Sequence, residues 1–548
     1  KWGGIRLNRF SDDATSILDS CTIEYATNGI YCQNSNPTLT NNIIRHNIDG
    51  VEADGASGPI VIGNQFMFNE VPLKIYGNEI DGNLFDNIYE ENRLITESNG
   101  VYDTTNTDYI YVTGENDNGS WEHLWENKTY HWLKDGAPYR LTDYINIYSN
   151  NNGYTSKLKI YPQTKIVLES GKYIYVGSTD SDSWGALEAD SVTFSSVNED
   201  ETWSEIRMRY TSRDDMTYLD NCIIEYADNG VYCEGSSPTL TNNIFRYNND
   251  GVESDGGSIP KIMDNTFLEN VRPISVYAQR IDSTLYGNSY IDNDKNYIEV
   301  QSDYINENGT FVWAMDGAPY VITGDITVER ENNSGQISIL KIEPGTELRF
   351  NSGSELFIGH QSNGNRRGAL QADGVTFSRA SDIETWPGID IRNFSVDENT
   401  YLNNCIIEYA TDGIYCQNSN PTLSNNIFRY NTDGVESDAG SNPKIFDNQF
   451  IDNNRPVMYY SHKLDSTMYG NTYEDNEKNY IELVGEWINW DNGVHVWPMD
   501  GAPYRVIQNV HIRANGNGSW LSTLKIEPGT VVEFNSGVEF DISYTNNG

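Results

Sequence analysis

The sequence predicts an all-β fold, a right-handed parallel β-helix solenoid with coils of about 22 residues in tandem blocks of about 183 residues. Two repeat lengths, one inside the other, are the main observations behind this prediction. The third is composition: 37% of residues are hydrophobic, Tyr is common at 37 residues, and Asn, Gly, Asp, Ser and Thr fill much of the rest. Such a composition is typical of short strands joined by turns.

The longer repeat is visible in two motifs. The motif CTIEYATNGIYC and its close variants start at Cys21, Cys222 and Cys405. The motif DGAPY starts at Asp135, Asp316 and Asp500. Three of the four spacings agree on one block of roughly 183 residues, which is the length of a repeat module rather than of a single coil. The first copy is longer, and we place its extra residues around Glu97–Glu122.

The blocks restart near Trp132, Trp313 and Trp497. We therefore expect a partial block at residues 1–131, blocks at 132–312 and 313–496, and the start of a further block at 497–548. Because the chain begins and ends inside a block, we expect it to be a segment of a longer tandem array.

The shorter repeat is carried by asparagine. Asparagines recur about every 22 residues within each copy, which is one coil of short strands, each paired in parallel with its equivalent one coil on. A second series follows a few positions later in each case. Asn suits the corners, because it tolerates left-handed backbone and its amide can bond to the Asn above and below. The first series consists of Asn42, Asn64, Asn87, Asn243, Asn265, Asn288, Asn426, Asn448 and Asn471.

A leucine-rich-repeat solenoid has a similar period, but it needs Leu at fixed positions and a helical segment, and neither is present. The stacked asparagines and the phrases NPTLTNN, SPTLTNN and NPTLSNN resemble the pectate-lyase-like right-handed β-helix superfamily. The longer unit, with DGAPY, LKIEPGTELRFNSGSELFIG, GALQADGVTFS and WPGIDI, is similar to modules of large archaeal and bacterial surface proteins. The resemblance implies a fold and a cell-surface location. It says little about activity, since the superfamily holds both enzymes and inert fibres.

The formal net charge is −44, which makes nucleic acid and anionic membranes poor partners. No run of apolar residues is long enough to span a membrane, so we expect no membrane insertion in this segment. The carboxylates either keep the surface solvated or recruit divalent cations such as calcium. No other cofactor is expected.

The six cysteines form three local pairs: Cys21 with Cys32, Cys222 with Cys233, and Cys405 with Cys416. If the flanking residues face each other across the turn, each pair can form a short disulfide, which would indicate an oxidising compartment. The alternative is buried free thiols, which behave as small hydrophobic groups. The alternative gains weight because facing sheets lie about 10 Å apart, whereas a disulfide needs Cα atoms within about 7 Å.

Six Asn-X-Ser/Thr sequons make N-glycosylation possible: Asn118, Asn127, Asn308, Asn332, Asn393 and Asn517.

The best polar constellation lies in the motif DGVEADG and its two copies. Strand alternation and stacking place an outward Glu, an Asp and a Tyr near one another in each copy: Glu52, Asp54 and Tyr76; Glu253, Asp255 and Tyr277; Glu436, Asp438 and Tyr460. These groups could form a solvated strand face, bind calcium or a glycan, or act as a carboxylate pair in glycoside chemistry. Three observations argue against catalysis. The constellation recurs in every copy, no basic residue recurs beside it, since Lys74 is replaced by Ser275 and Met458, and the seven His share no repeat position.

Six tryptophans cluster near the block boundaries, where they either pack between consecutive blocks or form an aromatic platform for sugars: Trp121, Trp125, Trp132, Trp487, Trp490 and Trp497.

These features favour a structural role. We expect a repeat segment of an extracellular fibre, sheath or appendage at the cell surface that self-assembles as a rigid rod, with other copies of itself as partner. A calcium-dependent, glycan-binding adhesin is the first alternative, and a polysaccharide lyase or hydrolase is the second.

Overall fold

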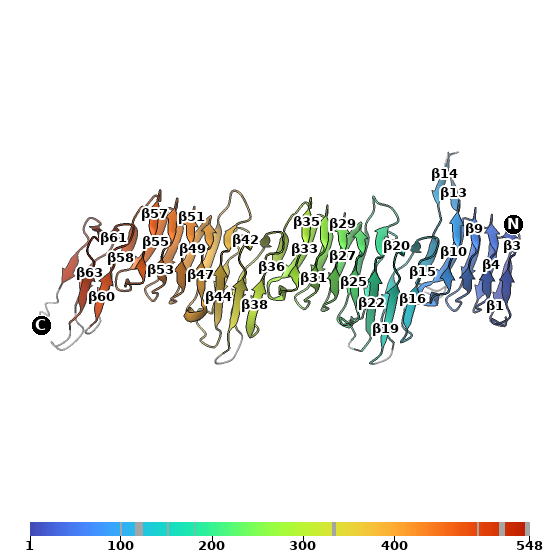
Figure 1. The fold of residues 1–548 in the computed structure, drawn as a ribbon, viewed down its shortest axis with the longest axis horizontal. Helices are drawn as coiled ribbons and strands as arrows, with labels where there is room; N and C mark the ends of the chain where they lie inside the picture. Colours follow the sequence, from blue (N-terminus) through green and yellow to red (C-terminus); the bar gives the residue numbers. More distant parts are fainter. Residues whose placement is uncertain are drawn as a thin grey trace. The chain divides into compact units, whose positions relative to one another are not determined.

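The computed structural model of the chain describes residues 1–98, 101–114, 124–150, 153–180, 182–330, 336–489, 493–513 and 521–542. Within these residues the chain forms 65 short β-strands and three 3-10 turns, and no α-helix (Figure 1). No helix in this part of the chain is therefore long and apolar enough to cross a bilayer. The predicted all-β solenoid of parallel strands is confirmed.

Two compact units divide the chain. The first contains residues 1–275 and 284–296, and the second contains residues 276–283 and 297–548. Each unit is a parallel β-helix in which most strands pair with the strand three places later along the chain, one coil on.

In the first unit, one column of strands shows the register clearly. β3 (Thr22–Glu24), β6 (Ile43–Arg45), β9 (Gln65–Met67) and β12 (Ile88–Glu90) pair in parallel. The pairing stacks Ile23 on Ile44, Phe66 and Tyr89, all of them buried. The side chains of this column therefore form one continuous strip of the core, with Phe66 and Tyr89 stacked at 5.0 Å between ring centroids.

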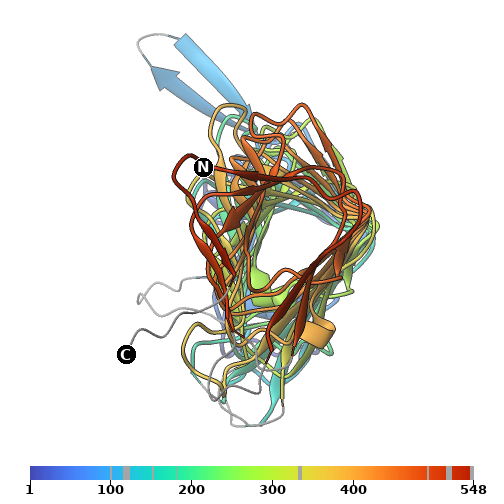
Figure 2. The ribbon, with the colours of Figure 1, turned by 90° about the vertical axis from the view of Figure 1, so that its left-hand side faces the viewer.

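A hairpin that starts at Arg93, before the predicted stretch Glu97–Glu122, contains part of the extra residues of the first copy. β13 (Arg93–Ser98) and β14 (Val101–Asn106) pair antiparallel, unlike the coils around them. Figure 2 shows this hairpin pointing away from the coils of its unit. The insertion therefore adds a hairpin without interrupting the stacking, since β10 (Val71–Tyr76) pairs directly with β15 (Ile110–Thr113) beyond it.

In the second unit, the equivalent column is β48 (Ile406–Glu408), β51 (Ile427–Arg429), β54 (Gln449–Ile451) and β57 (Thr472–Glu474). A second wall runs through β43 (Leu356–Ile358), β46 (Trp386–Ile391), β49 (Ala410–Cys416), β52 (Asp433–Ser437), β55 (Arg455–Tyr460) and β58 (Ile481–Val484). This second wall carries most of the charged residues discussed below.

Buried asparagines form hydrogen-bonded ladders inside the corners. The side-chain Nδ2 of Asn42 donates to Oδ1 of Asn64 at 3.0 Å, and Nδ2 of Asn64 donates to Oδ1 of Asn87 at 3.2 Å. Each Oδ1 also accepts the backbone N–H of the Asn one coil earlier, at 2.9 and 3.0 Å. The ladders therefore satisfy buried backbone groups that the tight corners would otherwise leave unbonded.

Two of these ladders end on an aspartate from the DGAPY motif. Asn87 donates its backbone N–H and its Nδ2 to the carboxylate of Asp135, at 2.8 and 2.9 Å. Asn471 makes the same two bonds to Asp500, both at 2.9 Å. A carboxylate only accepts hydrogen bonds, so it suits the end of a ladder whose amides all donate in one direction.

The predicted disulfides are wrong: all six cysteines are free, and five of them are buried, with Cys21 exposed. The reason is visible in the second copy. Cys222 precedes β26 (Ile223–Glu225), whereas Cys233 ends β27 (Ala227–Cys233), and these strands belong to different sheets. The two thiols therefore pack in different walls of the coil, and burial raises the pKa of Cys222 to about 12. The five buried cysteines therefore fit the alternative stated above, that of buried free thiols.

Candidate functional site

The predicted constellation lies on one wall of each copy. It starts in β7 (Asp49–Ala53), β30 (Asp250–Ser254) and β52. In each strand the Val is fully buried, and the following Glu is only half-buried on the outer face. Alternation along the strand therefore presents Glu52, Glu253 and Glu436 to the outside.

Each of the three aspartates of the constellation holds together the turn of its own copy. Asp54 accepts hydrogen bonds from the backbone N–H of Asn34 one coil earlier, at 3.0 Å, and of Ala56, at 3.2 Å. It also accepts from the Ser57 hydroxyl at 2.6 Å. Asp255 and Asp438 bond to the equivalent groups, at 2.7 to 3.0 Å. These carboxylates bond to the backbone of the corner in every copy, and calcium binding by them stays a prediction.

The three tyrosines do not form one open face with these aspartates. Tyr76 is buried, with 6% of its surface exposed. Tyr277 is half-buried at the end of β33 (Arg272–Tyr277). Tyr460 is half-buried at the end of β55. The repeat spacing predicts their place along the coil, but it does not predict their burial.

In the first copy, the outer carboxylate has a weak counter-ion. Glu52 accepts from Lys74 at 3.3 Å, and it also accepts from the amide of Asn28. The neighbouring Asp49 is more buried, and its pKa is raised to about 6 by burial and by the charge of Glu52. The lysine side chain is 42% exposed, so solvent screens this pair strongly.

In the third copy, one arginine is the counter-ion for a group of carboxylates. Arg455 donates to both oxygens of Asp433, at 2.6 and 2.8 Å, to Glu436 at 2.6 Å and to Glu482 at 2.7 Å. Its side chain is only 17% exposed. A charge-assisted network of this kind, with a forked pair to Asp433, holds the wall of the coil rigid.

Beside this arginine lies the only group of three carboxylates in the described residues whose oxygens are close enough to share a metal ion. Asp412, Asp433 and Glu436 have ligand atoms within 4.8 Å of one another. Burial and the charges of Glu436 and Asp433 raise the pKa of Asp412 to about 7. Because the Arg455 guanidinium bonds to two of the three acids, it already supplies the positive charge that a cation would bring. The group differs from the predicted one, since Asp438 and Tyr460 take no part.

The second copy overturns one argument about basic residues. Arg272 donates to the two oxygens of Asp250 at 2.6 and 2.9 Å, and its guanidinium lies 3.8 Å from Glu253. A basic residue therefore does recur beside the constellation, in the second and third copies. The residues equivalent to Lys74 are not basic in those copies. The arginines are equivalent to Val71, and the strand register places this position opposite the first aspartate of the motif, not opposite the glutamate.

The tryptophans near the block boundaries divide into two classes. Trp132 and Trp497 are fully buried, as packing residues would be. Trp125 and Trp487 are 37% and 40% exposed, while Trp121 and Trp490 lie outside the described residues. Trp487 stacks on His511 at 4.3 Å between ring centroids.

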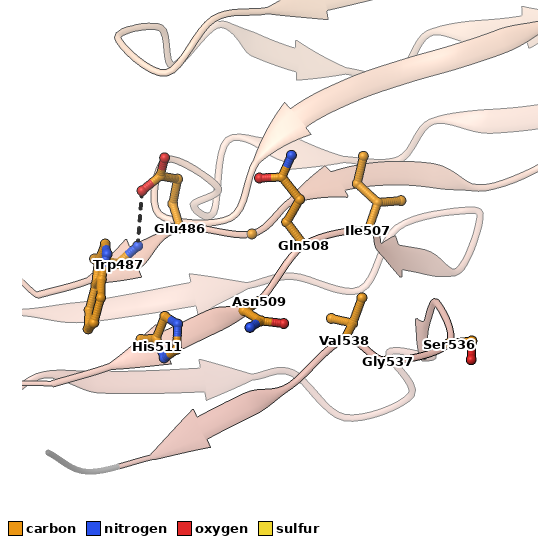
Figure 3. A pocket seen from close by; sticks show the side chains of 10 residues that line it. Glu486, Trp487, Ile507, Gln508, Asn509, His511, Ser536, Gly537 and Val538 are labelled. Atoms are coloured by element: carbon orange, nitrogen blue, oxygen red, sulfur yellow. Dashed lines mark hydrogen bonds between the residues drawn. The ribbon is translucent and has the colours of Figure 1, made fainter. Parts of the chain in front are cut away.

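Trp487 lines a shallow cavity of about 540 Å³ in the second unit. Figure 3 shows its indole beside the His511 ring, with the Glu486 carboxylate accepting the backbone N–H of Trp487. The guanidinium of Arg513 lies over the indole at 3.8 Å. Gln508 and Asn509 are further polar groups that line the cavity. A half-exposed aromatic ring beside polar side chains is a surface on which a sugar can stack.

Three of the sequons lie in the described residues. Asn308 is exposed, whereas Asn127 and Asn393 are half-buried. The side chain of Asn393 accepts a hydrogen bond from Asn418 at 2.8 Å. Asn118, Asn332 and Asn517 lie outside the described residues. Glycosylation at all six stays a prediction.

Comparison with known proteins supports the fold. A family model for the right-handed beta helix region matches residues 178–334 and 358–525, which together are more than half of the chain. No curated protein sequence matches the chain. One solved structure that matches is the catalytic domain of a GH87 alpha-1,3-glucanase in complex with tetrasaccharides, at 12% identity. The alignment covers 79% of this chain and 64% of the glucanase chain, with a TM-score of 0.14. A TM-score this low carries no argument about activity.

Proposed function

Since the chain belongs to the right-handed β-helix family, we propose that it is a structural repeat segment of an extracellular surface fibre, sheath or appendage, which assembles with copies of itself. In a solenoid each coil contacts only its neighbours, so an array can lengthen without a change of design. Within each unit, coils stacked at a spacing of about 4.8 Å form one regular rod segment.

One observation carries the proposal: the strongest polar constellation of the sequence is engaged in holding the coils together. Asp54, Asp255 and Asp438 bond to turn backbone in all three copies. The outer glutamates of the third and first copies are paired with Arg455 and Lys74. The aspartates recur because each copy of the long repeat needs the same turn, which is a structural reason for their repetition.

Electron microscopy of purified protein tests the proposal, together with small-angle X-ray scattering of the same sample. We expect filaments of constant width, or shorter rods made of several copies, at high concentration. Compact particles with no tendency to associate end to end or side by side would contradict the proposed role.

Calcium gives a second test, because the aspartates of the constellation bond to turn backbone and Arg455 pairs with the outer glutamate of the third copy. We expect the thermal unfolding midpoint to differ by less than a degree or so between 5 mM calcium and 5 mM EDTA. A rise of several degrees with calcium would show that a cation binds the folded chain, and the adhesin alternative would then replace the rod.

The proposed structural role includes no catalytic activity on polysaccharides. Incubation with acidic polysaccharides, followed by measurement of unsaturated or reducing-end products, checks this point. Products that disappear in a Glu436→Gln variant would require a catalytic role for this wall.

A second candidate, glycan binding, rests on Trp487. Its indole is 40% exposed and lines a cavity together with polar side chains. A glycan array of the intact chain, compared with a Trp487→Ala variant, separates this function from the rod. Loss of a defined glycan signal in the variant would support binding, and an array without any signal would exclude it for the glycans displayed.

A further inference from the structure

A second cavity in the same unit is lined by more basic than acidic side chains. It has a volume of about 520 Å³ and lies between three consecutive parts of the coils. These are β53 (Lys444–Phe446), the segment that follows β55, and the start of β60 (Val494–Trp497). A cavity of this size can hold a molecule as large as a monosaccharide.

Four basic side chains line this cavity: Lys444, His462, Lys463 and His495. Among the residues that the structure describes, neither lysine has a carboxylate partner within ion-pair distance. The lining contains one carboxylate, that of Asp465. This group already accepts hydrogen bonds from the Thr467 backbone at 2.8 Å and from the amide of Asn442 at 2.8 Å. In the described part of the chain, the two lysine ammonium groups therefore have no direct ion-pair partner, although the formal net charge of the chain is −44.

His462 adds a polar atom that has no partner. Its Nε2 lies 3.1 Å from the carbonyl oxygen of Ala439, so this nitrogen carries the proton. Its Nδ1 is buried and has no hydrogen-bond partner among the described residues. In the neutral ring Nδ1 is an acceptor, and after protonation it becomes a donor beside two ammonium groups. Buried polar atoms without partners are rare in proteins and call for an explanation, such as a bound group.

The first copy shows that the fold does not require these basic groups. Aligned by the block repeat, it has Ile60, Asn78, Glu79 and Tyr130 where the third copy has Lys444, His462, Lys463 and His495. The neighbouring aspartate is kept, as Asp81 and Asp465. The first copy therefore shows that the coil keeps the aspartate without the two lysines or His462. The second copy has the basic residues Lys261 and Arg280 at the lysine positions and Gln279 in place of His462.

We propose that this basic cavity binds an organic oxyanion, a carboxylate or sulfate group carried on a molecule the size of a sugar. The lysine ammonium groups supply the charge, and His462 supplies a further donor once it is protonated. Val494, whose side chain is largely exposed at the rim, offers an apolar contact for the body of the ligand. The site goes beyond the proposed rod, because it would give one block of the array a specific small-molecule partner.

The strongly acidic surface makes the test selective, because it repels anions everywhere outside a built site. Isothermal titration calorimetry of the full chain at constant ionic strength would use sodium sulfate, sodium glucuronate and glucose as probes. We expect saturable binding of glucuronate with a millimolar or lower Kd, and none of glucose. Saturation by sulfate as strong as by glucuronate would identify the oxyanion alone as the ligand. No saturable binding of either anion at 50 mM would overturn the proposal.

The double variant Lys444→Ile and Lys463→Gln assigns the binding to this cavity. Both side chains are at least partly exposed, so the coils should stay folded, which far-ultraviolet circular dichroism checks. We expect a loss of affinity of at least tenfold. Lys261→Ile is the matched control, since Lys261 occupies the same strand position in the second copy, and it should leave binding unchanged. Equal affinity in the double variant and the wild type would contradict the assignment.

The pH dependence gives an independent readout. Burial lowers the pKa of both His462 and His495 below the ordinary value, so both are largely neutral at pH 7. The charged groups around them are Lys444, Lys463, Asp465 and Glu486. Protonation of the histidines adds positive charge, so affinity should rise severalfold from pH 7.5 to pH 5.5. In His462→Gln, which carries the residue of the second copy, this rise should be smaller, and an unchanged rise would contradict the role of His462. Because the calorimetry measures binding per chain, whether or not chains associate, its outcome is independent of whether fibres form.

Discussion

The first and third copies of the repeat share their interior and differ in their exterior. Inside, Ile44, Phe66 and Tyr89 stack in the first copy as Phe428, Phe450 and Tyr473 stack in the third. The asparagine ladders have the same bonds and both end on the aspartate of a DGAPY motif. Stacking repeats every interior side chain against its own equivalent, so a change at one position is felt by the coils on both sides.

Outside, the same backbone positions carry different chemistry. The wall that holds Val71 and Lys74 in the first copy holds Arg455 and Met458 in the third. The arginine is largely buried among carboxylates, whereas the lysine makes one exposed pair. Interior positions are therefore constrained by stacking, while outward positions are free to acquire local functions. Four substitutions or measurements test this difference.

The largest effect is expected for the ladder, and it should be equal in the two copies. Asn64→Ala and Asn448→Ala each remove an amide with several bonds; that of Asn448 donates to Leu423 and Asn471 and accepts twice from Asn426. Several buried backbone groups lose their partners, so we expect each variant to lose about 3 kcal/mol or more of unfolding free energy. Denaturant unfolding measures the loss. The exposed Asn454→Ala is the control and should cost about 0.5 kcal/mol or less. A small loss in either ladder variant would show that the ladders are not essential.

The next effect should differ between the copies. Arg455→Val, which gives the third copy the residue of the first, leaves Asp433, Glu436 and Glu482 without their common partner. We expect a loss of about 3 kcal/mol at pH 8, and a smaller loss at pH 5, where protonation relieves the repulsion. Lys74→Met makes the matched change in the first copy and should cost less than about 1 kcal/mol, because the pair is exposed. Equal losses at the two positions would contradict the contrast drawn between them.

A smaller, stabilising effect is expected from Asp412→Asn. Asn is the residue at this position in the other two copies, at Asn28 and Asn229. The pKa of Asp412 is raised to about 7, so the folded state binds its proton more tightly than the unfolded state. Stability from this group therefore falls as the pH rises from about 4 to 7. The variant should gain about 1 kcal/mol at pH 8 and nothing below pH 4. Unfolding curves across this range check the sign, and a loss at pH 8 would show that Asp412 is a charged, favourable partner of Arg455.

The smallest perturbation is a labelling experiment. Cys21 is exposed and the other five thiols are buried, with the pKa of Cys32 and Cys405 raised to about 12 by burial. A thiol reagent should label one cysteine quickly in the native chain and six after denaturation without reductant. Mass spectrometry of the labelled peptides identifies them. No labelling after denaturation would restore the disulfide prediction.

Much of the fold was predictable because its signal is periodic. Asn42, Asn64 and Asn87 stack as their spacing predicted, since a constant period places equivalent residues on equivalent coils. The distance between two residues on different strands of the same coil leaves no periodic signal in the sequence. The pairing of Cys222 with Cys233 failed because the turn between them spreads the two strands into different sheets. In the sequence, the aspartate of the DGAPY motif served only to measure the repeat. Its place after a series of regularly spaced asparagines could have predicted that it ends the ladder.

The candidate sites were less predictable than the fold. Asp54 and its copies were assigned outward positions, but the tightness of the corner turns each carboxylate toward backbone N–H groups. Arg455 was missed because a long side chain reaches beyond its own register, from the level of Asp433 to Glu436 and Glu482. The basic cavity draws on residues from Lys444 to His495, and neither histidine recurs in the other copies. A search for repeated positions therefore passes over it.

The amino-acid sequence by itself determined the coil length, the order of the strands and the residues that stack, because these follow from periodicity and from the need to satisfy buried polar groups. Only the tertiary structure decided which outward groups meet. That depends on the width of each coil, on the path of each corner and on the reach of side chains across neighbouring coils. None of these is periodic, so the walls, the free thiols and the basic cavity became visible only once the coils were stacked.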